Sequence, residues 1–247
     1  MIAYEVLRII DFKPLFALEH YQRLCNTILN KNKNIKLDYN TFILKIKHLI
    51  EKNNLKIGNI RIEIIFDNTS SDFEIKTLVI PYSYPSDYDY KNGVKTITHL
   101  HTREEPNFKI WNQNLRENID SLIKTQNVYE IIYVNKNNFL SEGSRSNLFF
   151  IKDRKLISAK PEDILLGISR KYVIESAKSL GLDLVEMDIP LSEIENYDSA
   201  FISGTSPKVL PVRKINEIYF GSNNQYLRAL MIEFEKKINA DILNFQF

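Results

Sequence analysis

The alternation of apolar and polar residues predicts strands and helices in the first hundred residues. Residues 2–10 (IAYEVLRII) fit a strand. Residues 17–31 and 41–53 place apolar side chains three or four positions apart, which predicts amphipathic helices. Asp38 or Asn40 is placed to cap the second helix. Further strands are predicted at 60–65, 74–82 and 95–101. This region therefore has an α+β pattern of one strand, two helices and three strands.

The second region contains short strands and three further helices. The helices are predicted at 114–125, 168–180 and 224–239, and Gly181 follows the second of them as a C-cap. The strands are predicted at 128–134, 146–151, 155–158, 183–188, 199–203 and 208–213. A polar segment from Thr102 to Asn107 separates the two regions. We therefore expect an α+β protein with a small α/β domain at 1–104 and a larger β-rich domain with flanking helices at 105–247.

Composition narrows the classes of partner. The chain has 33 basic and 31 acidic residues, and the basic ones are not gathered into a patch. We therefore expect no nucleic-acid partner. No apolar run approaches the roughly 20 residues that span a bilayer, so no membrane partner is expected either. Cys25 is the only cysteine, which excludes an internal disulfide and, with no signal-like start, indicates the cytoplasm.

Two histidines near the predicted boundary raise the question of a metal. His99 and His101 alternate on a predicted strand and would share one face. Only Glu104 and Glu105 follow as further ligand types, which is a poor set for a metal. We therefore expect surface histidines and no metal site.

Two polar segments lie beside apolar strands or open a helix. Glu142 is central in Phe139–Phe150 (FLSEGSRSNLFF), where a buried carboxylate would need a partner. The alternative is an exposed hairpin tip. In Leu165–Arg170, Gly167 and Ser169 open a predicted helix, and free N–H groups there suit a phosphate. The alternative is ordinary N-capping.

Two further features are compatible with an anion site and a reactive amine. Ser203–Ser206 (SGTS) joins two apolar strands, and its small residues allow close approach of backbone to an anion, or simply a tight turn. Lys109 lies among Phe108, Ile110 and Trp111. Desolvation there favours the neutral, nucleophilic amine. A lysine that extends its amine to solvent is equally consistent with the sequence.

The order and spacing of these segments resemble the class IV aminotransferase family, also called fold-type IV pyridoxal-phosphate enzymes. That family includes branched-chain and D-amino-acid aminotransferases and aminodeoxychorismate lyases. The matching segments are KIWN at 109–112, YEII at 129–132, SEGSRSN at 141–147, GISR at 167–170 and FISGTSPKVLPV at 201–212. YEVLR at 4–8 and EHYQRL at 19–24 are similar to the segment with the family's phosphate-binding arginine. The resemblance covers most of residues 1–220.

The resemblance implies pyridoxal 5′-phosphate as cofactor and assigns two catalytic residues. Lys109 would hold the cofactor as a Schiff base and later shuttle the substrate proton. Glu142 would pair with the pyridine nitrogen and keep it protonated. The implied cofactor-binding set is Arg23, Lys109, Glu142, Ser146, Asn147, Gly167, Ile168, Ser169, Gly204 and Thr205. For Arg23 the alternative is an exposed helix arginine.

The resemblance also suggests substrate-binding residues. Arg61 matches an arginine near the substrate of branched-chain aminotransferases, although an edge-strand arginine is an equal alternative. Ser206 matches a position that offers a backbone N–H to the substrate carboxylate, and Tyr4 would line the pocket. Arg145 departs from the family, where a small or acidic residue is usual. It would contact the phosphate, a substrate carboxylate or only solvent.

A second departure lies at the front of the chain. Family members carry an additional hairpin before the segment that matches Tyr4, and this hairpin builds part of their substrate pocket. Here the chain begins almost at that strand. We therefore expect the cofactor residues, but not the substrate specificity, to follow the family.

The resemblance implies an aminotransferase that moves an amino group between an amino acid and a 2-oxo acid. The alternative is an aminodeoxychorismate lyase that releases pyruvate and forms 4-aminobenzoate. A non-catalytic protein with a decayed site is a third reading, against which the retained Lys109, Glu142 and Thr205 argue. The family also implies a homodimer with its active site between the two domains.

Overall fold

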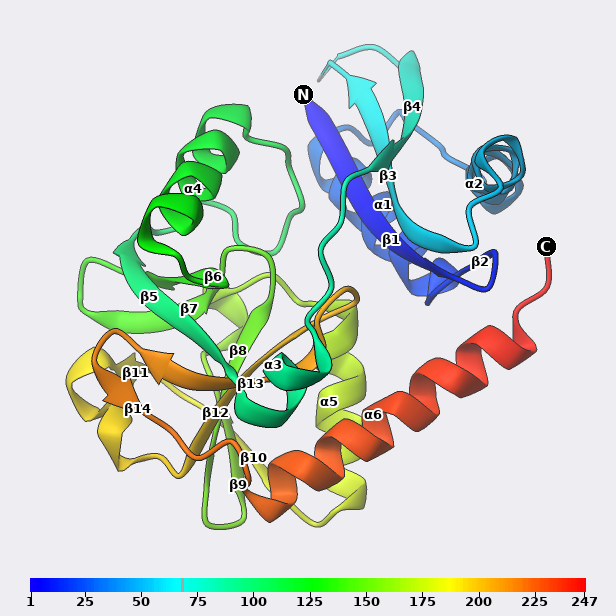
Figure 1. The fold of residues 1–247 in the computed structure, drawn as a ribbon. Helices are drawn as coiled ribbons and strands as arrows, with labels where there is room; N and C mark the ends of the chain where they lie inside the picture. The colour runs from blue at the N-terminus through cyan, green and yellow to red at the C-terminus, as the bar shows by residue number, and fades with distance from the viewer. Residues whose placement is uncertain (68) are drawn as a thin grey trace. The chain divides into compact units, whose positions relative to one another are not determined.

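A computed structural model describes residues 1–67 and 69–247. The chain forms two compact units (Figure 1). The first unit contains Met1–Ser83, Phe108–Trp111 and Lys237–Phe247. The second contains Tyr84–Asn107 and Asn112–Lys236. Three segments that are separate in the sequence therefore make up the first unit.

The first unit is built on a four-stranded antiparallel sheet in the order β2-β1-β3-β4. Its strands are β1 (Ile2–Ile10), β2 (Lys13–Pro14), β3 (Ile57–Phe66) and β4 (Phe73–Ile80). The helices α1 (Ala17–Lys31) and α2 (Tyr39–Asn53) pack against this sheet (Figure 1). The predicted strand at 2–10 and both predicted helices are confirmed. Asp38 caps α2, because its side chain accepts a hydrogen bond from Thr41 N at 2.8 Å.

The second unit is built on a ten-stranded sheet in the order β10-β9-β8-β12-β13-β5-β6-β7-β11, with β14 paired to β13. Its strands are β5 (Val94–Leu100), β6 (Glu130–Val134), β7 (Phe139–Gly143), β8 (Asn147–Lys152), β9 (Lys155–Ser158), β10 (Asp183–Glu186), β11 (Ile189–Pro190), β12 (Ser199–Gly204), β13 (Lys208–Ile215) and β14 (Ile218–Tyr219). Its helices are α3 (Asp87–Asn92), α4 (Gln113–Gln126), α5 (Ile168–Ser179) and the first part of α6 (Gln225–Asn244), with short 3-10 turns at Pro161–Asp163 and Leu191–Asn196.

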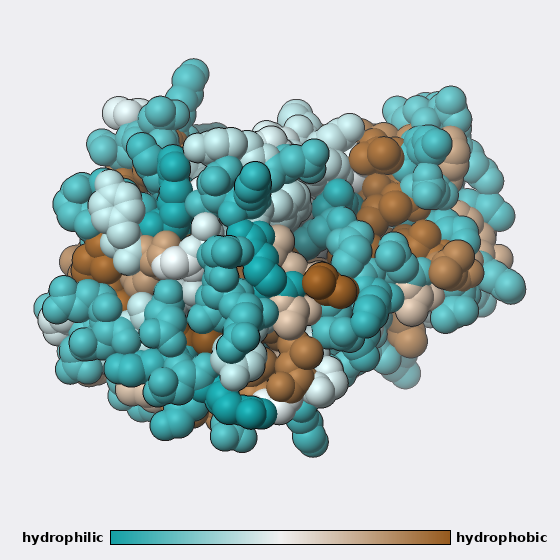
Figure 2. Space-filling model, turned by 60° about the horizontal axis from the view of Figure 1, so that its bottom comes forward, coloured by the Kyte–Doolittle hydropathy of each residue, from teal (hydrophilic) through white to brown (hydrophobic). Residues whose placement is uncertain are grey.

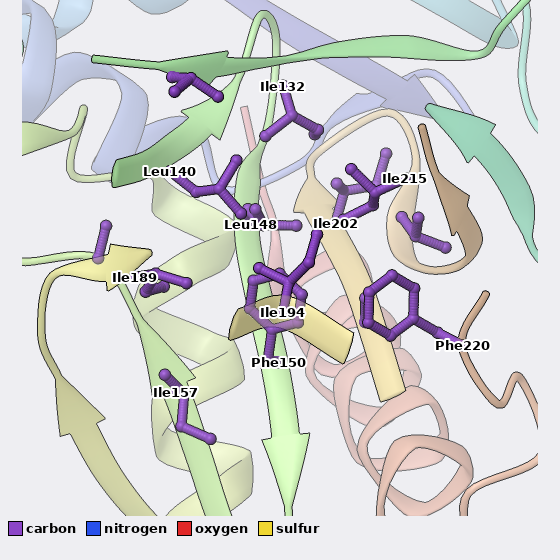
Figure 3. Packing of buried hydrophobic residues seen from close by; sticks show 14 of the residues in the cluster. Ile132, Leu140, Leu148, Phe150, Ile157, Ile189, Ile194, Ile202, Ile215 and Phe220 are labelled. Atoms are coloured by element: carbon purple, nitrogen blue, oxygen red, sulfur yellow. The ribbon is translucent and has the colours of Figure 1, made fainter. Parts of the chain in front are cut away.

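One apolar cluster forms the main core of the second unit. Figure 3 shows Ile132 of β6, Phe150 of β8 and Ile202 of β12 within it, and each of these side chains is fully buried. Burial of aliphatic and aromatic side chains is the main favourable term in folding. On the α4 side, Ile119 packs with Ile131 of β6 in a separate small cluster. Apolar side chains from several strands therefore form the core of this unit.

Strand β5 belongs to the sheet of the second unit, although the sequence pattern grouped it with the strands of the first region. It pairs in parallel with β6 and with β13, and not with the strands of the first unit. Alternation of apolar residues reports which face of a strand is buried, but not which strand is its neighbour. Helix α6 also continues beyond residue 239, to Asn244.

On the face in view in Figure 2, hydrophilic residues predominate and hydrophobic residues appear in scattered groups. Within the described residues, no helix combines the length and the apolar character that crossing a bilayer requires.

Candidate active site

The segment with Lys109 runs beside the first residues of β1. Tyr4 N donates to Lys109 O at 3.2 Å, and Trp111 N donates to Ile2 O at 2.9 Å. Strand β3 pairs with the other edge of β1, so residues 108–111 extend the small sheet on the β2 side. This backbone pairing fixes the position of the Lys109 backbone, from which the side chain extends.

The Lys109 amine belongs to a buried cluster of charged groups. Its side chain is 17% exposed, and Nζ lies 3.8 Å from Glu5 Oε2. Glu5 is fully buried on β1. Arg23 of α1 donates from Nε to Glu5 Oε1 and from Nη2 to Oε2, both at 2.7 Å, and His20 Nδ1 lies 2.8 Å from Oε2. The 13% exposed Arg23 side chain is therefore not the exposed helix arginine that the sequence left open.

Electrostatics favour the ionised form of Glu5. Burial acts to raise the pKa of this carboxyl, but the charges of Arg23 and Lys109 and the hydrogen bonds from Arg23 and His20 outweigh it, so the pKa is lowered. Burial lowers the pKa of His20 despite the opposing effect of Glu5. A neutral His20 beside an ionised carboxylate must carry its proton on Nδ1.

Two other predicted residues pack with Trp111 in the same unit. The Tyr4 ring meets the Trp111 ring edge to face, with centroids 5.1 Å apart. The Arg61 guanidinium carbon lies 4.2 Å from the Trp111 ring centroid, and Arg61 Nε lies 2.8 Å from Glu63 Oε1. Strand β3 lies between β1 and β4, so the edge-strand interpretation of Arg61 is wrong.

In the second unit, Glu142 lies on β7 and is 3% exposed. The exposed hairpin tip that the sequence left open is therefore wrong. Leu165 N donates to Glu142 Oε2 at 3.2 Å, and Asn147 Nδ2 donates to the same oxygen at 3.4 Å. Arg103 Nε lies 2.8 Å from Glu142 Oε1. The carboxylate thus has cationic and neutral partners, as a buried charge requires.

A second buried acid, Glu130, supports the turn after Glu142. Arg145 N donates to Glu130 Oε1 at 2.5 Å, and Ser146 Oγ donates to Oε2 at 2.9 Å. Burial raises the pKa of Glu130, although these two hydrogen bonds act to lower it. A Cβ at Gly143 would lie 2.6 Å from Glu130 Oε1, so this packing needs a glycine. Glu130 was missed as a site residue, and its signal was an acid inside the apolar strand YEII.

The start of α5 has features that fit an anion. Gly167 is the N-cap and offers no side chain to the free N–H groups. A Cβ there would collide with Asn147 Oδ1. Ile168 and Ser169 are both buried, and Ser169 Oγ has no hydrogen-bond partner among the described residues. An uncapped helix start with an unsatisfied buried hydroxyl fits a phosphate group.

The SGTS turn lies beside Asn147 because Ser203 of β12 pairs with Asn147 of β8. Ser203 Oγ is buried and, among the described residues, has no hydrogen-bond partner. Gly204, Thr205 and Ser206 follow at the end of β12 and are half-buried. The second unit therefore brings together its predicted residues from three segments far apart in the sequence.

Arg145 and the two histidines do not extend this group. Arg145 forms an ion pair with Asp120 of α4, and its side chain is 52% exposed. It therefore faces the surface rather than the buried groups. His99 is exposed, and burial lowers the pKa of the half-buried His101. Within residues 1–67 and 69–247, no group of three or more potential ligands could hold a metal ion.

The predicted site residues thus form two groups, each defined within its own unit. The first unit holds Tyr4, Arg23, Arg61 and Lys109. The second unit holds Glu142, Ser146, Asn147, Gly167, Ile168, Ser169, Gly204, Thr205 and Ser206. Sequence reasoning missed Glu5 and His20, although both lie inside segments that carried the resemblance.

Comparisons with known proteins agree with this picture. The family model for amino-transferase class IV matches residues 2–215. A probable branched-chain-amino-acid aminotransferase of Thermotoga maritima is 30% identical over 224 residues, covering 88% of this chain and 78% of the relative. The aminodeoxychorismate lyase of Bacillus subtilis is 23% identical over 255 residues, covering 95% of this chain and 85% of the relative.

A solved structure shows the same fold. It is a putative 4-amino-4-deoxychorismate lyase from Legionella pneumophila, with a TM-score of 0.84 and 21% identity over 96% of this chain and 91% of that one. The predicted fold class is therefore confirmed. The family match spans most of the chain, from β1 to the end of β13. The protein is an enzyme and belongs to the class IV aminotransferase family.

Proposed function

We propose that this enzyme is a pyridoxal-phosphate-dependent aminotransferase that moves an amino group between an amino acid and a 2-oxo acid. The observation that carries the proposal is the Lys109 amine, which is mostly buried and lies 3.8 Å from an ionised carboxylate beside an arginine. Such a lysine has the shielded setting that a covalent amine needs. Membership of the family supports the same cofactor.

Two residues carry the chemistry in this proposal. Pyridoxal phosphate, when bound, accepts the electrons left on a substrate carbon after its proton is removed. Lys109 would hold the cofactor through its amine and would move the substrate proton. Glu142 would accept a hydrogen bond from the protonated ring nitrogen. Its contacts with Leu165 N, Asn147 and Arg103 hold the carboxylate in one orientation.

The remaining residues bind and orient in the same proposal. Arg23, the start of α5 at Ile168 and Ser169, and Thr205 hold the phosphate. The unsatisfied hydroxyl of Ser169 supports this assignment. The backbone around the phosphate is shaped by Asn147, Gly167 and Gly204. Ser146 holds the adjoining turn through its hydrogen bond to Glu130.

For the substrate, we assign carboxylate recognition to Arg61 and to the backbone at Ser206. Tyr4 lines the pocket. Trp111 and Glu63 hold the Arg61 guanidinium from two sides, which reduces its freedom before a substrate arrives.

Aminodeoxychorismate lyase is the second candidate. It is supported by the Bacillus subtilis relative, whose match covers 95% of this chain, and by the Legionella pneumophila fold neighbour. In both reactions Lys109 would remove a proton from the substrate. They differ in their products, because the aminotransferase would yield a 2-oxo acid whereas the lyase would release pyruvate and form 4-aminobenzoate.

The lysine assignment is tested by colour and reduction. The purified protein should absorb visible light when loaded with pyridoxal phosphate, and borohydride should bleach it. Lys109→Ala should abolish this absorbance. Lys214→Ala is the matched control, because Lys214 is also 17% exposed and pairs with a carboxylate, that of Glu217. Absorbance that survives in Lys109→Ala would show that another amine holds the cofactor.

The two reactions are separated by their products. The loaded enzyme is incubated with L- or D-amino acids and 2-oxoglutarate, and glutamate is followed. In parallel it receives aminodeoxychorismate, and pyruvate is followed. We expect glutamate. Pyruvate without amino-acid turnover would reject the aminotransferase proposal in favour of the lyase.

We further propose that the enzyme works in the cytoplasm as a homodimer. The single cysteine supports a reducing compartment, and the family resemblance supports the dimer. Sedimentation equilibrium should give twice the chain mass. A mass of one chain at micromolar concentration would contradict the dimer.

A further inference from the structure

Glu5 occupies a position where the strand pattern calls for an apolar side chain. Ala3, Leu7 and Ile9 alternate along β1 and are buried in the apolar core under α1 and α2. Glu5 lies in the same alternating row and is 0% exposed. A carboxylate in such a row is strongly unfavourable unless its partners compensate for lost hydration. Its presence therefore calls for a reason other than packing.

The partners of Glu5 account for its ionised state. Both carboxylate oxygens accept from Arg23, and Oε2 also meets His20 Nδ1 and lies 3.8 Å from Lys109 Nζ. The lowered pKa of Glu5 agrees with this geometry. One carboxylate thus contacts both the lysine and the arginine to which the proposed function assigns the cofactor.

His20 fixes the orientation of this carboxylate. The imidazole is 1% exposed, and its Nδ1–H points at Glu5 Oε2. Its Nε2 has no hydrogen-bond partner among the described residues, so Glu5 is the one polar contact found for the ring there. A buried ring held on a fixed helix restricts how the carboxylate can turn.

We propose that Glu5, oriented by His20, is a positioning residue that fixes the Arg23 guanidinium for the cofactor phosphate. This inference rests on the proposed function. Arginine has a long side chain with many rotamers, and it loses that freedom when it binds an anion. The two parallel bonds to Glu5 fix the plane of the guanidinium in advance. Glu5 therefore acts on phosphate affinity through Arg23.

The test compares a ligand with and without the phosphate. Apoenzyme is titrated with pyridoxal phosphate and with pyridoxal, and the absorbance that depends on Lys109 gives both Kd values. The ratio of the pyridoxal Kd to the pyridoxal phosphate Kd measures the contribution of the phosphate group separately from any effect of Glu5 on the lysine. Glu5→Gln should weaken pyridoxal phosphate binding about 10-fold more than pyridoxal binding, as expected for the loss of a charge-assisted hydrogen bond.

A matched control is available on the neighbouring strand. Glu63 is also a buried acid paired with an arginine, but it lies on the opposite face of the sheet. Glu63→Gln should leave the ratio of the two Kd values unchanged. The proposal would be overturned if Glu63→Gln lowered this ratio as much as Glu5→Gln does. Removal of any buried charge would then be enough to weaken the preference for the phosphate.

Coupling to Arg23 tests how Glu5 acts. Arg23→Gln alone should lower the ratio, and adding Glu5→Gln should lower it no further. The double variant also leaves neither charge of the buried pair uncompensated, so it remains informative if Glu5→Gln alone does not fold. If the two substitutions lowered the ratio additively, Glu5 would act independently of Arg23, and the proposal would be overturned.

Failure of the proposed function gives different results. If Lys109 does not hold the cofactor, the wild-type protein binds neither ligand through Lys109 and no ratio exists. If the enzyme is the lyase instead, the ratio is still measurable, and the product assay identifies this case. A wild type that prefers pyridoxal phosphate, with an unchanged preference in Glu5→Gln, would overturn only the role of Glu5.

Discussion

Glu5, Glu130 and Glu142 are buried carboxylates with different partners, and their chemistry differs accordingly. Cations surround Glu5 and lower its pKa, whereas burial dominates at Glu130, which has mainly neutral donors, and raises its pKa. Glu142 has one cation, Arg103, and two neutral donors. Residue type alone therefore does not set the charge of a carboxyl group in this protein.

Replacing Glu142 should affect turnover more than cofactor binding. The neutral amide of Glu142→Gln cannot keep the ring nitrogen protonated, so electron withdrawal from the substrate weakens. We expect kcat to fall about 100-fold or more, a loss typical of removing one electrostatic stabiliser. The Kd for pyridoxal phosphate should change little. Steady-state kinetics and cofactor titration check this, and equal losses in both would contradict the role.

Glu5 should make stability depend on pH at the acid end. Its folded pKa is lowered from 4.5, so its contribution is present above that value and is lost as pH falls below it. The difference in unfolding free energy between wild type and Glu5→Gln should therefore shrink on acidification. Urea denaturation at about pH 7 and about pH 4 measures it. A difference that grows at low pH would show that Glu5 is not ionised when folded.

At the residue scale, the order of the motifs identified candidate side chains but not their neighbours in space. Lys109, Glu142 and Ser169 follow from spacing and family resemblance. The partnership of Glu5 with Arg23 and His20 depends on how α1 packs on β1, which local patterns do not encode. The assigned roles stay predictions until the variants are measured.

At the scale of elements, the longer helices α1, α2, α4, α5 and α6 were the most predictable part of the chain, whereas the short helix α3 was not predicted. Their apolar residues recur at helical spacing, and the observed bounds of α1 equal the predicted range 17–31. Sheet membership was less predictable, as β5 shows. Its partners β6 and β13 follow it by 30 or more residues, and no local signal selects between them and the small sheet.

The junction between β8 and α5 should tolerate no added methyl group. In Gly167→Ala the new Cβ meets Asn147, whose amide bonds Leu165 O at 2.8 Å. We expect a loss of about 1–3 kcal/mol in unfolding free energy, as for other overpacked sites, together with weaker pyridoxal phosphate binding. Urea denaturation and cofactor titration measure the two effects.

Gly58→Ala provides the comparison. There the new Cβ would lie 2.8 Å from Leu55 Cδ1, the end of a flexible side chain that can turn away. Its effect on stability should be smaller, and cofactor binding should stay normal. Equal effects at both glycines would argue against a tight junction at Gly167.

At the scale of the whole molecule, the last residues belong to the first unit. Asp241 accepts a hydrogen bond from Phe16 N at 2.7 Å, Lys13 Nζ donates to Ile242 O at 2.8 Å, and Phe245 packs on the core of that unit. These contacts hold the start of α1, where Phe16 is the N-cap without a side-chain cap of its own.

Removal of Lys237–Phe247 should therefore loosen the first unit selectively. We expect faster hydrogen exchange in α1 and β1 and little change in β8 and β12, whose core lies in the second unit. Exchange measured by mass spectrometry on the full-length and shortened proteins tests this. Equal acceleration in both units would show that the tail contributes to the whole chain rather than to one unit.

The sequence could not show that the chain returns to the first unit at Phe108–Trp111. A polar stretch before Lys109 suggested a boundary at 104–105, because composition marks linkers but not re-entry into an earlier sheet. Pairing of this segment with β1 depends on residues about a hundred positions away. The predicted domain division stays a prediction about independent folding.

That return has a consequence for recombination between relatives. A single crossover anywhere from residue 84 to 107 would give Lys109 from one parent and its Glu5–Arg23 neighbours from the other. Chimeras that keep the lysine with its native surroundings need a second exchange limited to four residues, 108–111. Natural or laboratory shuffling of this gene should therefore retain 1–83 and 108–111 from one ancestor, even where everything between them is exchanged.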